Sequence, residues 1–574
     1  MGLHGIGIGG GIAVNKIHID HMNTGRTGGG NGGPRERCVL MSAEAETQRL
    51  DHAMARIKKR LRNIADGLGD KSGGEKDIFE YQILVLEDAD FTGGLYARTA
   101  AGACAEDAVE AVCGEYIETF ANIDNDYLRQ RAIDIVDIRD QLMSALSRSG
   151  ADTDPDPGCP DFECILVAAD LTPSRAAGLD PAKVRGILLE NGGESSHTVI
   201  LARSLGIPCI IGVEGLLNGV SEGVAAIMDG GTGEIIYDPT EEQLARSAGR
   251  LNAIRAERDA LSAYIDKAAV TSDGVRISVF ANITSPNEAA ALIGNGGEGA
   301  GLLRTEFLYM SGQSPPDENA QCAFYSSIAE SLGGRPLIIR TLDAGGDKHI
   351  AYLNIGDEDN PYLGYRAIRY CIDNPDVFKT QLRAILRASK SGDIRVMFPM
   401  IATVDELKTA RRLLEEARGE LAPGECRPDI MAGIMMETPA AAMTADLLAK
   451  YADFFSIGTN DLTQYIFAAD RNNKKVAHLN SCYHPALLRA VNLICKAAAR
   501  QKIEVDICGQ AGEFPDLIPV WLAMGITALS VSIPAIPGVK KRVCDTDISK
   551  ASRALADILD MEDAESVKKR LKTI

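Results

Sequence analysis

Apolar residues recur at helical spacing near the start of the chain and in short strand-like runs further along it. From Leu50 to Ile64 they follow one another three or four positions apart, which is the repeat of a helix with one buried face. Further helical segments are predicted over 75–88, 105–120 and 126–146. We therefore predict an α-helical bundle over residues 43–150.

The next part of the chain alternates β-type runs with short helical stretches. After an Asp-Pro-rich link, these runs occupy 164–169, 184–189, 209–213 and 225–229. We predict a compact α/β domain over residues 151–239, to which a first strand and a glycine-rich loop in residues 1–42 also belong. A charged helix rich in Ala and Leu over 240–268 is interpreted as a linker.

Residues 269–574 show a regular alternation of apolar runs and helix-like segments. The helix-like segments include 365–388, 404–417, 440–450 and 485–500. Eight strand candidates are 275–282, 299–306, 336–343, 394–400, 430–437, 453–461, 503–509 and 528–533. This alternation predicts a C-terminal (β/α)8 barrel of the TIM type, so the whole chain is predicted to be a multidomain α/β protein.

Two stretches, 5–10 and 294–299, match the G-x-G-x-x-G pattern of dinucleotide-binding loops. Neither lies between a buried strand and a helix with an acidic residue downstream, which is the context that the pattern requires. We interpret both as turns without a nucleotide role.

His197 lies between a predicted strand and a predicted helix, in Gly192-Gly193-Glu194-Ser195-Ser196-His197-Thr198. Backbone N–H groups and the positive end of a helix stabilise a phosphoryl group at such a junction. Because a neutral imidazole can attack phosphorus and later release the group, His197 is a candidate phosphoryl carrier. The alternative is a helix-capping or core histidine, which the Gly-Gly and Ser-Ser flanks disfavour. Thr172, in the turn Asp170–Ser174, is expected to place a hydroxyl near this imidazole.

Polar residues gather where the predicted barrel strands end, which is the face that carries active sites in barrels of this type. They are Arg304, Glu306, Arg340, Asp343, Glu437, Asn460, Asp461 and Cys508. Arg304, Arg340 and Arg471 are expected to converge on a small polyanion, because planar guanidinium groups favour phosphate and carboxylate. Structural ion pairs are the alternative for any one of them.

Two further features of this rim suggest chemistry. Glu437 and Asp461, carboxylates on neighbouring strand ends, are typical of a Mg²⁺ site that substrate oxygens and water complete. Cys508 follows an apolar run and precedes Gly509, so its thiol is predicted to donate a proton to a carbanion or enolate. The alternative is an ordinary buried cysteine.

Composition narrows the class of protein. The 574 residues include 60 basic and 80 acidic side chains, a formal net charge of −20, which disfavours nucleic-acid binding and favours a basic protein partner. The 13 cysteines form no Cys-x-x-Cys pair, as expected for reduced thiols in a cytoplasmic enzyme. Neither a run long enough for membrane insertion nor a secretory signal is evident, so we expect a soluble, cytoplasmic protein.

Acidic side chains cover much of the predicted helical bundle, although an ordinary solvated surface would also explain them. They are Glu80, Glu87, Asp88, Asp90, Glu106, Asp107, Glu110 and Glu115.

Several long motifs resemble those of one enzyme family. Besides the segment around His197, they are Gly301–Phe307, Arg340–Lys348, Asn360–Arg369, Gly433–Ala440 and Phe454–Tyr465. Over essentially its full length the sequence resembles enzyme I of the phosphoenolpyruvate:sugar phosphotransferase system, the phosphoenolpyruvate-protein phosphotransferase family.

The resemblance implies that His197 takes the phosphoryl group of phosphoenolpyruvate, releasing pyruvate, and passes it to the histidine phosphocarrier HPr in the first step of sugar uptake. The helical insertion would dock HPr, the histidine domain would swing between HPr and the barrel, and the barrel would form a homodimer. By motif position, the residues that hold phosphoenolpyruvate would be Arg304, Arg340, Asn460, Asp461 and Arg471, with Arg366 and Lys348 as further candidates. Glu437 and Asp461 would bind Mg²⁺, and Cys508 would protonate the enolate of pyruvate.

Some positions depart from the family pattern. Gly10 stands in place of part of a usual Ser-Pro, Glu194 and Ser195 stand where Arg-Thr is common, and Gln510 stands where a glutamate beside the cysteine is usual. Pyruvate phosphate dikinase and phosphoenolpyruvate synthase share the histidine domain and barrel but add an ATP-binding region, and no Walker loop is present here. A regulatory phosphorelay protein with the same fold is the second alternative, which a sensory domain ahead of the helical bundle would favour.

Overall fold

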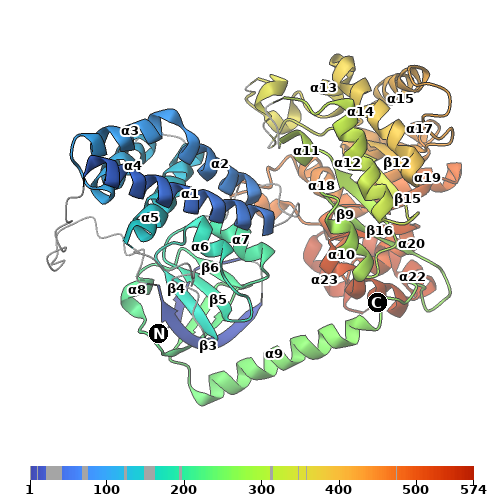
Figure 1. Ribbon diagram of the computed structural model, residues 1–574. Helices are drawn as coiled ribbons and strands as arrows, with labels where there is room; N and C mark the ends of the chain where they lie inside the picture. The colour runs from blue at the N-terminus through green and yellow to red at the C-terminus, as the bar shows by residue number, and fades with distance from the viewer. Residues whose placement is uncertain are drawn as a thin grey trace. The chain divides into compact units, whose positions relative to one another are not determined.

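The structure is a computed structural model that describes residues 2–8, 11–20, 42–67, 75–121, 126–147, 162–192, 197–310, 314–346, 348, 350–356, 358–473 and 475–573. The chain divides into two compact units, residues 1–256 and residues 257–574. Figure 1 labels the helices and strands of both.

Five helices form the first part of the N-terminal unit. They are α1 (Ala43–Gly67), α2 (Glu75–Glu87), α3 (Ala89–Ala100), α4 (Ala105–Ala121) and α5 (Asp126–Ser147). Leu50, Met54, Ile57 and Leu61 are buried in their common core, which confirms the apolar stripe that the spacing predicts.

Helix α3 is absent from the sequence-based prediction, because Gly93 and Gly94 weaken its helical signal. Asp88 fixes its first residue. The Asp88 carboxylate accepts hydrogen bonds from the backbone N–H groups of Asp90 and Phe91, which have no partner within the helix.

An eight-stranded sheet forms the rest of this unit, in the order β1-β8-β7-β3-β4-β5-β6-β2. The strands are β1 (Gly2–His4), β2 (Ile6–Ile8), β3 (Ile12–Ile19), β4 (Cys164–Ala168), β5 (Val184–Leu189), β6 (Cys209–Ile211), β7 (Ala225–Asp229) and β8 (Glu234–Tyr237). The adjacent strands β3, β4, β5 and β6 are parallel.

The interpretation of 5–10 as a turn is wrong for Ile6–Ile8, which is strand β2 and pairs antiparallel with β6. Gly7 lets the backbone of β2 lie close to the backbone at Gly230. A Cβ atom on Gly7 would lie 2.5 Å from the carbonyl oxygen of Gly230. The second glycine pattern does contain a turn, since Gly296 follows helix α10 (Glu288–Gly294) with a φ of 80°.

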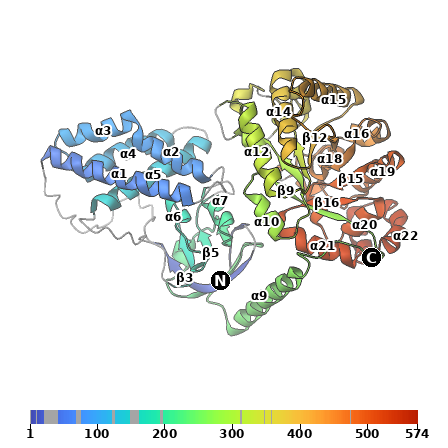
Figure 2. The same cartoon turned by 45° about the vertical axis from the view of Figure 1, so that its right-hand side comes forward.

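Short helices connect the strands of the sheet. They are α6 (Pro173–Ala177), α7 (His197–Ser204) and α8 (Leu216–Gly219). Helices α6 and α7 lie between the sheet and the five-helix bundle, where α6 packs against α5 and α7 against α2 (Figures 1 and 2). The predicted linker contains helix α9 (Glu241–Ser262), in which the chain passes from one unit to the other.

The C-terminal unit is a closed barrel of eight parallel strands, which confirms the predicted TIM-type architecture. The strands are β9 (Ser278–Ile283), β10 (Ala300–Arg304), β11 (Leu337–Arg340), β12 (Ile394–Phe398), β13 (Ala432–Met436), β14 (Phe454–Ile457), β15 (Glu504–Ile507) and β16 (Ala528–Val531).

Fourteen helices of this unit belong to its described residues. They are α10 (Glu288–Gly294), α11 (Glu306–Met310), α12 (Glu318–Ser331), α13 (Ile368–Asp373), α14 (Pro375–Ala388), α15 (Val404–Gly419), α16 (Pro439–Met443), α17 (Ala445–Leu448), α18 (Thr459–Phe467), α19 (Pro485–Gln501), α20 (Ile518–Met524), α21 (Ile536–Asp545), α22 (Ile548–Leu559) and α23 (Ala564–Leu571). Two single helices that the pattern predicts are each two helices. The segment 365–388 breaks at Asn374, before Pro375, and 440–450 breaks at Thr444.

Alternate residues of the barrel strands face two different cores. The larger core lies between strands and helices, and a small separate layer inside the barrel consists of Leu302, Ile338, Met397, Met435, Phe454 and Cys508. No helix among the described residues is both long and apolar enough to cross a membrane.

Candidate active site at the mouth of the barrel

A cavity of about 570 Å³ opens where the barrel strands end. Every barrel residue predicted for the site lines it: Arg304, Arg340, Lys348, Arg366, Glu437, Asn460, Asp461, Arg471 and Cys508. The structure therefore brings together side chains that are up to about two hundred positions apart in the sequence, as expected for the C-terminal face of a barrel.

Strand ends and helix starts position these side chains. Arg304 and Arg340 are the last residues of β10 and β11. Asn460 and Asp461 lie in the first turn of α18, which corrects the prediction of a strand over 453–461, because β14 ends at Ile457. Gly458 separates the two elements. A Cβ atom there would lie 2.9 Å from Oε2 of Glu437, so only glycine leaves room for this carboxylate.

Two buried carboxylates hold three of the cations. Asp343 Oδ1 accepts a hydrogen bond of 2.8 Å from Arg366, while Oδ2 lies 2.9 Å from Lys348 and 3.1 Å from Arg340. Glu306 accepts hydrogen bonds from both Arg340 and Lys348. Burial would raise the pKa of Asp343, but the three cations outweigh it and lower that pKa well below its usual range. The network therefore stays ionised at neutral pH.

Arg304 differs from Arg340 and Arg366. It is half-buried and makes no ion pair with any residue that the structure describes. Arg304 lines the cavity, where a bound anion could form an ion pair with its guanidinium group.

Glu437 and Asp461 are a carboxylate pair in the same cavity. Burial, followed by the negative charges of Asp461 and Asp343, raises the pKa of Glu437 to about 8. Oε1 of Glu437 accepts a hydrogen bond of 2.6 Å from the backbone N–H of Met400. Two hard anionic oxygen donors, of which Asp461 raises the proton affinity of Glu437, fit a small divalent cation. Among the residues with described side chains, no cluster of three or more His, Cys, Asp or Glu offers a fuller set of protein ligands.

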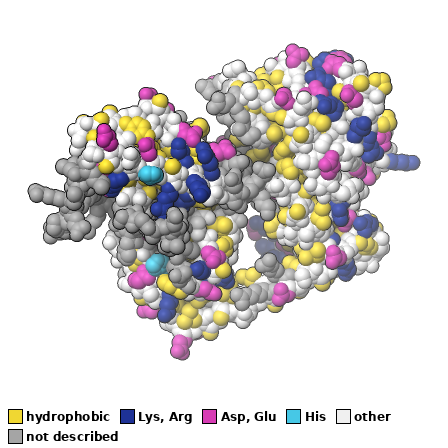
Figure 3. All heavy atoms as spheres, viewed as in Figure 1, with side chains coloured by type: hydrophobic (Ala, Val, Ile, Leu, Met, Phe, Trp, Pro, Cys, Tyr) yellow, Lys and Arg dark blue, Asp and Glu magenta, His cyan; other side chains and the backbone are white. Residues whose placement is uncertain are grey.

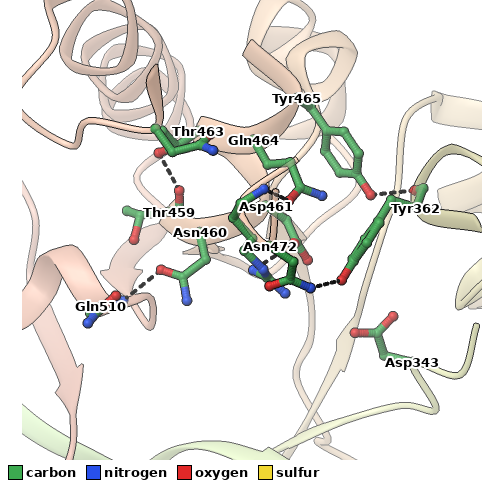
Figure 4. Close-up of polar contacts among 12 residues, drawn as sticks. Asp343, Tyr362, Thr459, Asn460, Asp461, Thr463, Gln464, Tyr465, Asn472 and Gln510 are labelled. Carbon is green, nitrogen blue, oxygen red and sulfur yellow. Dashed lines mark hydrogen bonds and ion pairs between the residues drawn. The ribbon is translucent and has the colours of Figure 1, made fainter. Parts of the chain in front are cut away.

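A tyrosine pair joins the loop after β11 to the segment around α18. The Tyr465 hydroxyl donates to the carbonyl oxygen of Tyr362 at 2.6 Å and accepts from Arg366 at 3.1 Å. The Tyr362 hydroxyl accepts from the Asn472 amide at 2.7 Å, and Figure 4 shows these two groups pointing toward each other. The Tyr362 ring also faces the Arg471 guanidinium group, whose carbon lies 5.9 Å from the ring centroid.

Arg471 is further held by the residues of α18. Its NH1 lies 3.1 Å from Oδ1 of Asp461, and its backbone N–H donates to Gln464 at 3.1 Å. One cavity cation is thus fixed by a carboxylate, an aromatic ring and the backbone.

Cys508 follows β15 and is only 3% exposed, at the floor of the cavity. Its thiol lies 3.7 Å from the carbonyl oxygen of Ile457. Burial, with a smaller contribution from Asp506, raises the pKa of Cys508 to about 12. The thiol is therefore protonated at neutral pH and can act as an acid. Gln510 stands where a glutamate is usual in the family. Its backbone N–H donates a hydrogen bond to Oδ1 of Asn460 at 3.1 Å (Figure 4).

His197 is the first residue of α7, which agrees with the predicted junction between a strand and a helix. Residues 193–196, with Glu194 and Ser195, and the His197 side chain lie outside the described part of the chain. Thr172 is buried immediately before α6. Its predicted contact with the imidazole involves the His197 side chain, so this contact also lies outside the described part of the chain. The next residue, Thr198, donates from Oγ1 to the carbonyl oxygen of Leu171 at 2.7 Å, which ties α7 to this turn.

Comparison with known proteins gives a consistent result along the chain. Residues 4–131, 160–233 and 258–548 match the models of the N-terminal domain, the mobile domain and the PEP-binding domain of PEP-utilising enzymes. The phosphoenolpyruvate-protein phosphotransferase of Bacillus subtilis (strain 168) is 37% identical over 570 residues, 98% of each chain. That of Priestia megaterium is 38% identical over 536 residues, 93% of each chain.

The chain belongs to the phosphoenolpyruvate-protein phosphotransferase family. A multiphosphoryl transfer protein of Rhodobacter capsulatus is also similar, with 43% identity over 483 residues that cover 83% of this chain and 58% of that protein. These matches confirm the resemblance that the motifs indicate.

In this member of the phosphotransferase family, the sequence does not predict the roles of several residues around the cavity. The sequence identifies Glu306 and Asp343 only as polar residues at strand ends, whereas the structure shows them as counter-ions of the cations in the cavity. Tyr362, Tyr465 and Asn472 had no predicted role. The signal available for the two tyrosines is that they stand within Asn360–Arg369 and Phe454–Tyr465, two of the family-like motifs.

Proposed function

We propose that this protein transfers the phosphoryl group of phosphoenolpyruvate to His197, releasing pyruvate, and then passes it to the histidine of an HPr-type phosphocarrier as the first step of sugar uptake. One observation supports the first step, in which phosphoenolpyruvate donates its phosphoryl group. The cavity combines arginines and a lysine with a carboxylate pair and a protonated thiol, which together match the phosphate, the carboxylate and the carbanionic product of that substrate.

Each cavity residue has a role in this proposal. Arg304, Arg340 and Arg471 bind the phosphate and carboxylate with Asn460, while Arg366 and Lys348 add positive charge and are held by Asp343. An imidazole nitrogen of His197 attacks phosphorus, the bond between phosphorus and the C2 oxygen breaks, and the enolate of pyruvate remains. The Cys508 thiol then donates its proton to C3 of the enolate.

Glu437 and Asp461 would hold Mg²⁺. The ion supplies positive charge that neutralises the transferring phosphoryl group. The raised pKa of Glu437 supports this assignment, because a neighbouring cation would relieve the repulsion between the carboxylates.

The acceptor surface is proposed to lie on α2, α3 and α4 of the helical bundle. Of the eight acidic residues noted in the sequence, seven are exposed, and only Glu106 is half-buried, paired with Arg49. Helix α1 carries the opposite charge, with basic side chains that include Lys59 and Arg62. Figure 3 shows a group of Lys and Arg side chains on one face of the N-terminal unit. A basic carrier would therefore meet the α2–α4 side.

A homodimer through the barrel is also part of the proposal. Leu363, which lines a second cavity of about 520 Å³, is 64% exposed, and Met443 of α16 is 80% exposed. Leu447 and Tyr451, which follow in the chain, are also exposed. Large exposed apolar side chains of this kind are typical of a protein interface. Met443→Glu should convert the dimer to a monomer in sedimentation measurements, and an unchanged mass would contradict this interface.

A cytoplasmic location completes the proposal. All the cysteines that the structure describes have free thiols, as expected in a reducing compartment.

The test of the function is a single-turnover reaction. Purified protein mixed with phosphoenolpyruvate and Mg²⁺, without carrier, should release about one pyruvate per chain and gain an acid-labile phosphate. His197→Ala should abolish both, whereas His52→Ala, at an exposed histidine of α1, should abolish neither. The absence of a pyruvate burst from the wild type would contradict the proposed function.

A further inference from the structure

Asp506 is a buried carboxyl group inside the barrel that the proposed reaction does not use. It is 6% exposed and lies directly opposite Ser456 in the pairing of β14 with β15. The Ser456 hydroxyl, itself completely buried, donates a hydrogen bond to Oδ1 of Asp506. Because burying a carboxyl group costs free energy, the burial of Asp506 inside the barrel suggests a functional role.

The same serine also acts on Cys508, because it lowers the pKa of the thiol in part. Cys508 lies two residues beyond Asp506, so both side chains point to the same side of the strand, into the barrel. Cys508, Ser456 and Asp506 therefore form a row of neighbouring polar side chains that begins at the floor of the cavity, and within this row Ser456 is hydrogen-bonded to Asp506.

Beyond Asp506 the row approaches the opposite end of the barrel. The charged groups that act on the pKa of Asp506 are Arg395 of β12 and Glu504 of β15. Arg395 lies 3.3 Å from both Glu504 and Asp393, and the Glu504 side chain is 67% exposed. A proton from solvent can thus approach Asp506 from the end of the barrel that does not hold the substrate cavity.

Asp506 can exist in both protonation states near neutral pH. Burial raises its pKa to about 7, although the Ser456 hydroxyl and Arg395 lower it in part. A group that relays protons must both give and regain them at the working pH.

We propose that Asp506 returns a proton to Cys508 through the Ser456 hydroxyl after each turnover. This inference rests on the proposed function, in which the thiol S–H bond breaks and a C–H bond forms at C3 of the pyruvate enolate. The thiolate takes the Ser456 proton while Ser456 takes the Asp506 proton, which leaves Asp506 as a carboxylate. Asp506 then gains a proton from solvent, so each pyruvate consumes one solvent proton.

Asp506 acts through Cys508 and is a positioning residue for the thiol proton, whereas Cys508 is the catalytic residue. The first turnover uses the proton that the thiol already carries. Only later turnovers depend on the row, and this difference separates a relay from a merely structural role.

The experiment compares the full-length wild type with Asp506→Asn, which keeps the shape of the side chain but cannot titrate, and with Ser456→Ala. Asp453→Asn is the matched control, because Asp453 precedes the neighbouring strand β14 and bonds the Ala432 N–H and Arg411 without contacting the row. Pyruvate release is measured in the first turnover, by rapid quench, and at steady state with excess carrier.

The first turnover of both row variants should stay within about twofold of the wild-type rate, while the steady-state rate should fall about tenfold. The decrease is smaller than a direct general acid contributes, because water in the cavity can also reprotonate the thiolate. The wild-type steady-state rate should fall as the pH rises above about 7, where Asp506 loses its proton, and this fall should be absent from Asp506→Asn.

Thiolate trapping gives a readout that does not depend on which step limits the rate. After one turnover, iodoacetamide should alkylate Cys508 several-fold more in Asp506→Asn and Ser456→Ala than in the wild type, as read by peptide mass spectrometry. Equal alkylation together with a wild-type pH profile would overturn the relay alone. A wild type that releases no pyruvate would overturn the proposed function and the relay with it.

Discussion

Most charges at the barrel mouth are buried and paired, whereas those of the helical bundle are mostly exposed. Asp343 and Glu306 are each 1% exposed, and Asp343 contacts Arg340, Lys348 and Arg366. Glu115 of α4, by contrast, has a side chain that is 62% exposed and an ion pair with Arg98.

This difference matches two kinds of recognition. A fixed array of cations holds a small anion in one geometry, because folding has already met the cost of ordering and desolvating the groups. An exposed acidic surface attracts a protein partner and releases it again, since exposed charges influence encounter more than affinity. The two regions therefore suit the collection and the delivery of a phosphoryl group, respectively.

Breaking the buried network should have the largest effect. Asp343→Asn leaves three cations without their shared carboxylate, so the free energy of unfolding of the barrel should fall by about 3–5 kcal/mol, with loss of phosphoenolpyruvate turnover. The chain has a single tryptophan, the buried Trp521 of the barrel, so urea unfolding followed by its fluorescence reports this unit alone. Glu115→Gln, in the helical bundle, should leave that transition unchanged. An unfolding midpoint of Asp343→Asn equal to that of the wild type would show that the network does not stabilise the barrel.

The carboxylate pair should make Mg²⁺ binding depend on pH. Because the pKa of Glu437 is about 8, the ion must displace a proton at lower pH, and its apparent affinity should rise about tenfold per pH unit up to about pH 8 and then level off. Calorimetry in buffers of different ionisation enthalpy should detect about one proton released per ion at neutral pH. Glu437→Gln should lose this proton release, and its absence from the wild type would contradict the assignment.

The stability of the metal-free protein should show the opposite trend. The folded state binds the Glu437 proton more tightly than the unfolded chain does. Its stability contribution is therefore full below the usual pKa of glutamate and is lost as the pH rises toward about 8.

The tyrosine pair offers a smaller change within the barrel. Tyr362→Phe removes the hydroxyl that accepts from Asn472 but keeps the ring over Arg471, so the KM for phosphoenolpyruvate should rise about threefold to tenfold while kcat stays constant. Tyr365→Phe is the matched control, because the Tyr365 hydroxyl accepts from the Asn374 amide at 3.1 Å and its ring packs on Tyr370 rather than on Arg471. Equal kinetics of the two variants would rule out this role for Tyr362.

The exposed surface should respond most weakly. Charge reversal at α4, in Asp107→Lys or Glu110→Lys, should raise the KM for the carrier about threefold and leave the pyruvate burst unchanged, since rim charges act mainly on association. Lys59→Glu, on the basic helix α1, should not weaken carrier transfer. If both changes had equal effects, the carrier would not be distinguishing the two sides of the bundle.

The barrel could be predicted from sequence because each of its strands is a short apolar run that ends in polar residues. The boundaries between strands and helices were less predictable. The apolar run Phe454–Ile457 continues into Gly458 and Thr459 without a break, so the first turn of α18 had the pattern of a strand. Helix α3 was missed because local glycine content outweighed the capping signal of Asp88.

The members of the candidate site were more predictable than its internal contacts. Strand ends and family-like motifs indicate Arg304, Glu437 and Cys508. They do not indicate that Asp343 holds Arg366 or that Ser456 lies opposite Asp506, because these pairings depend on strand register and on loops far apart in the sequence.

The most direct test of the division between collection and delivery is to load Arg304→Met from both directions and locate the phosphate by tandem mass spectrometry. Arg304 has no ion pair among the described residues, so its replacement should remove a substrate contact without breaking the buried network. We predict that phosphoenolpyruvate will fail to phosphorylate His197 in this variant, while phosphorylated carrier will still phosphorylate it at the wild-type rate. Normal loading from phosphoenolpyruvate, or equal loss of loading from both directions, would contradict the account.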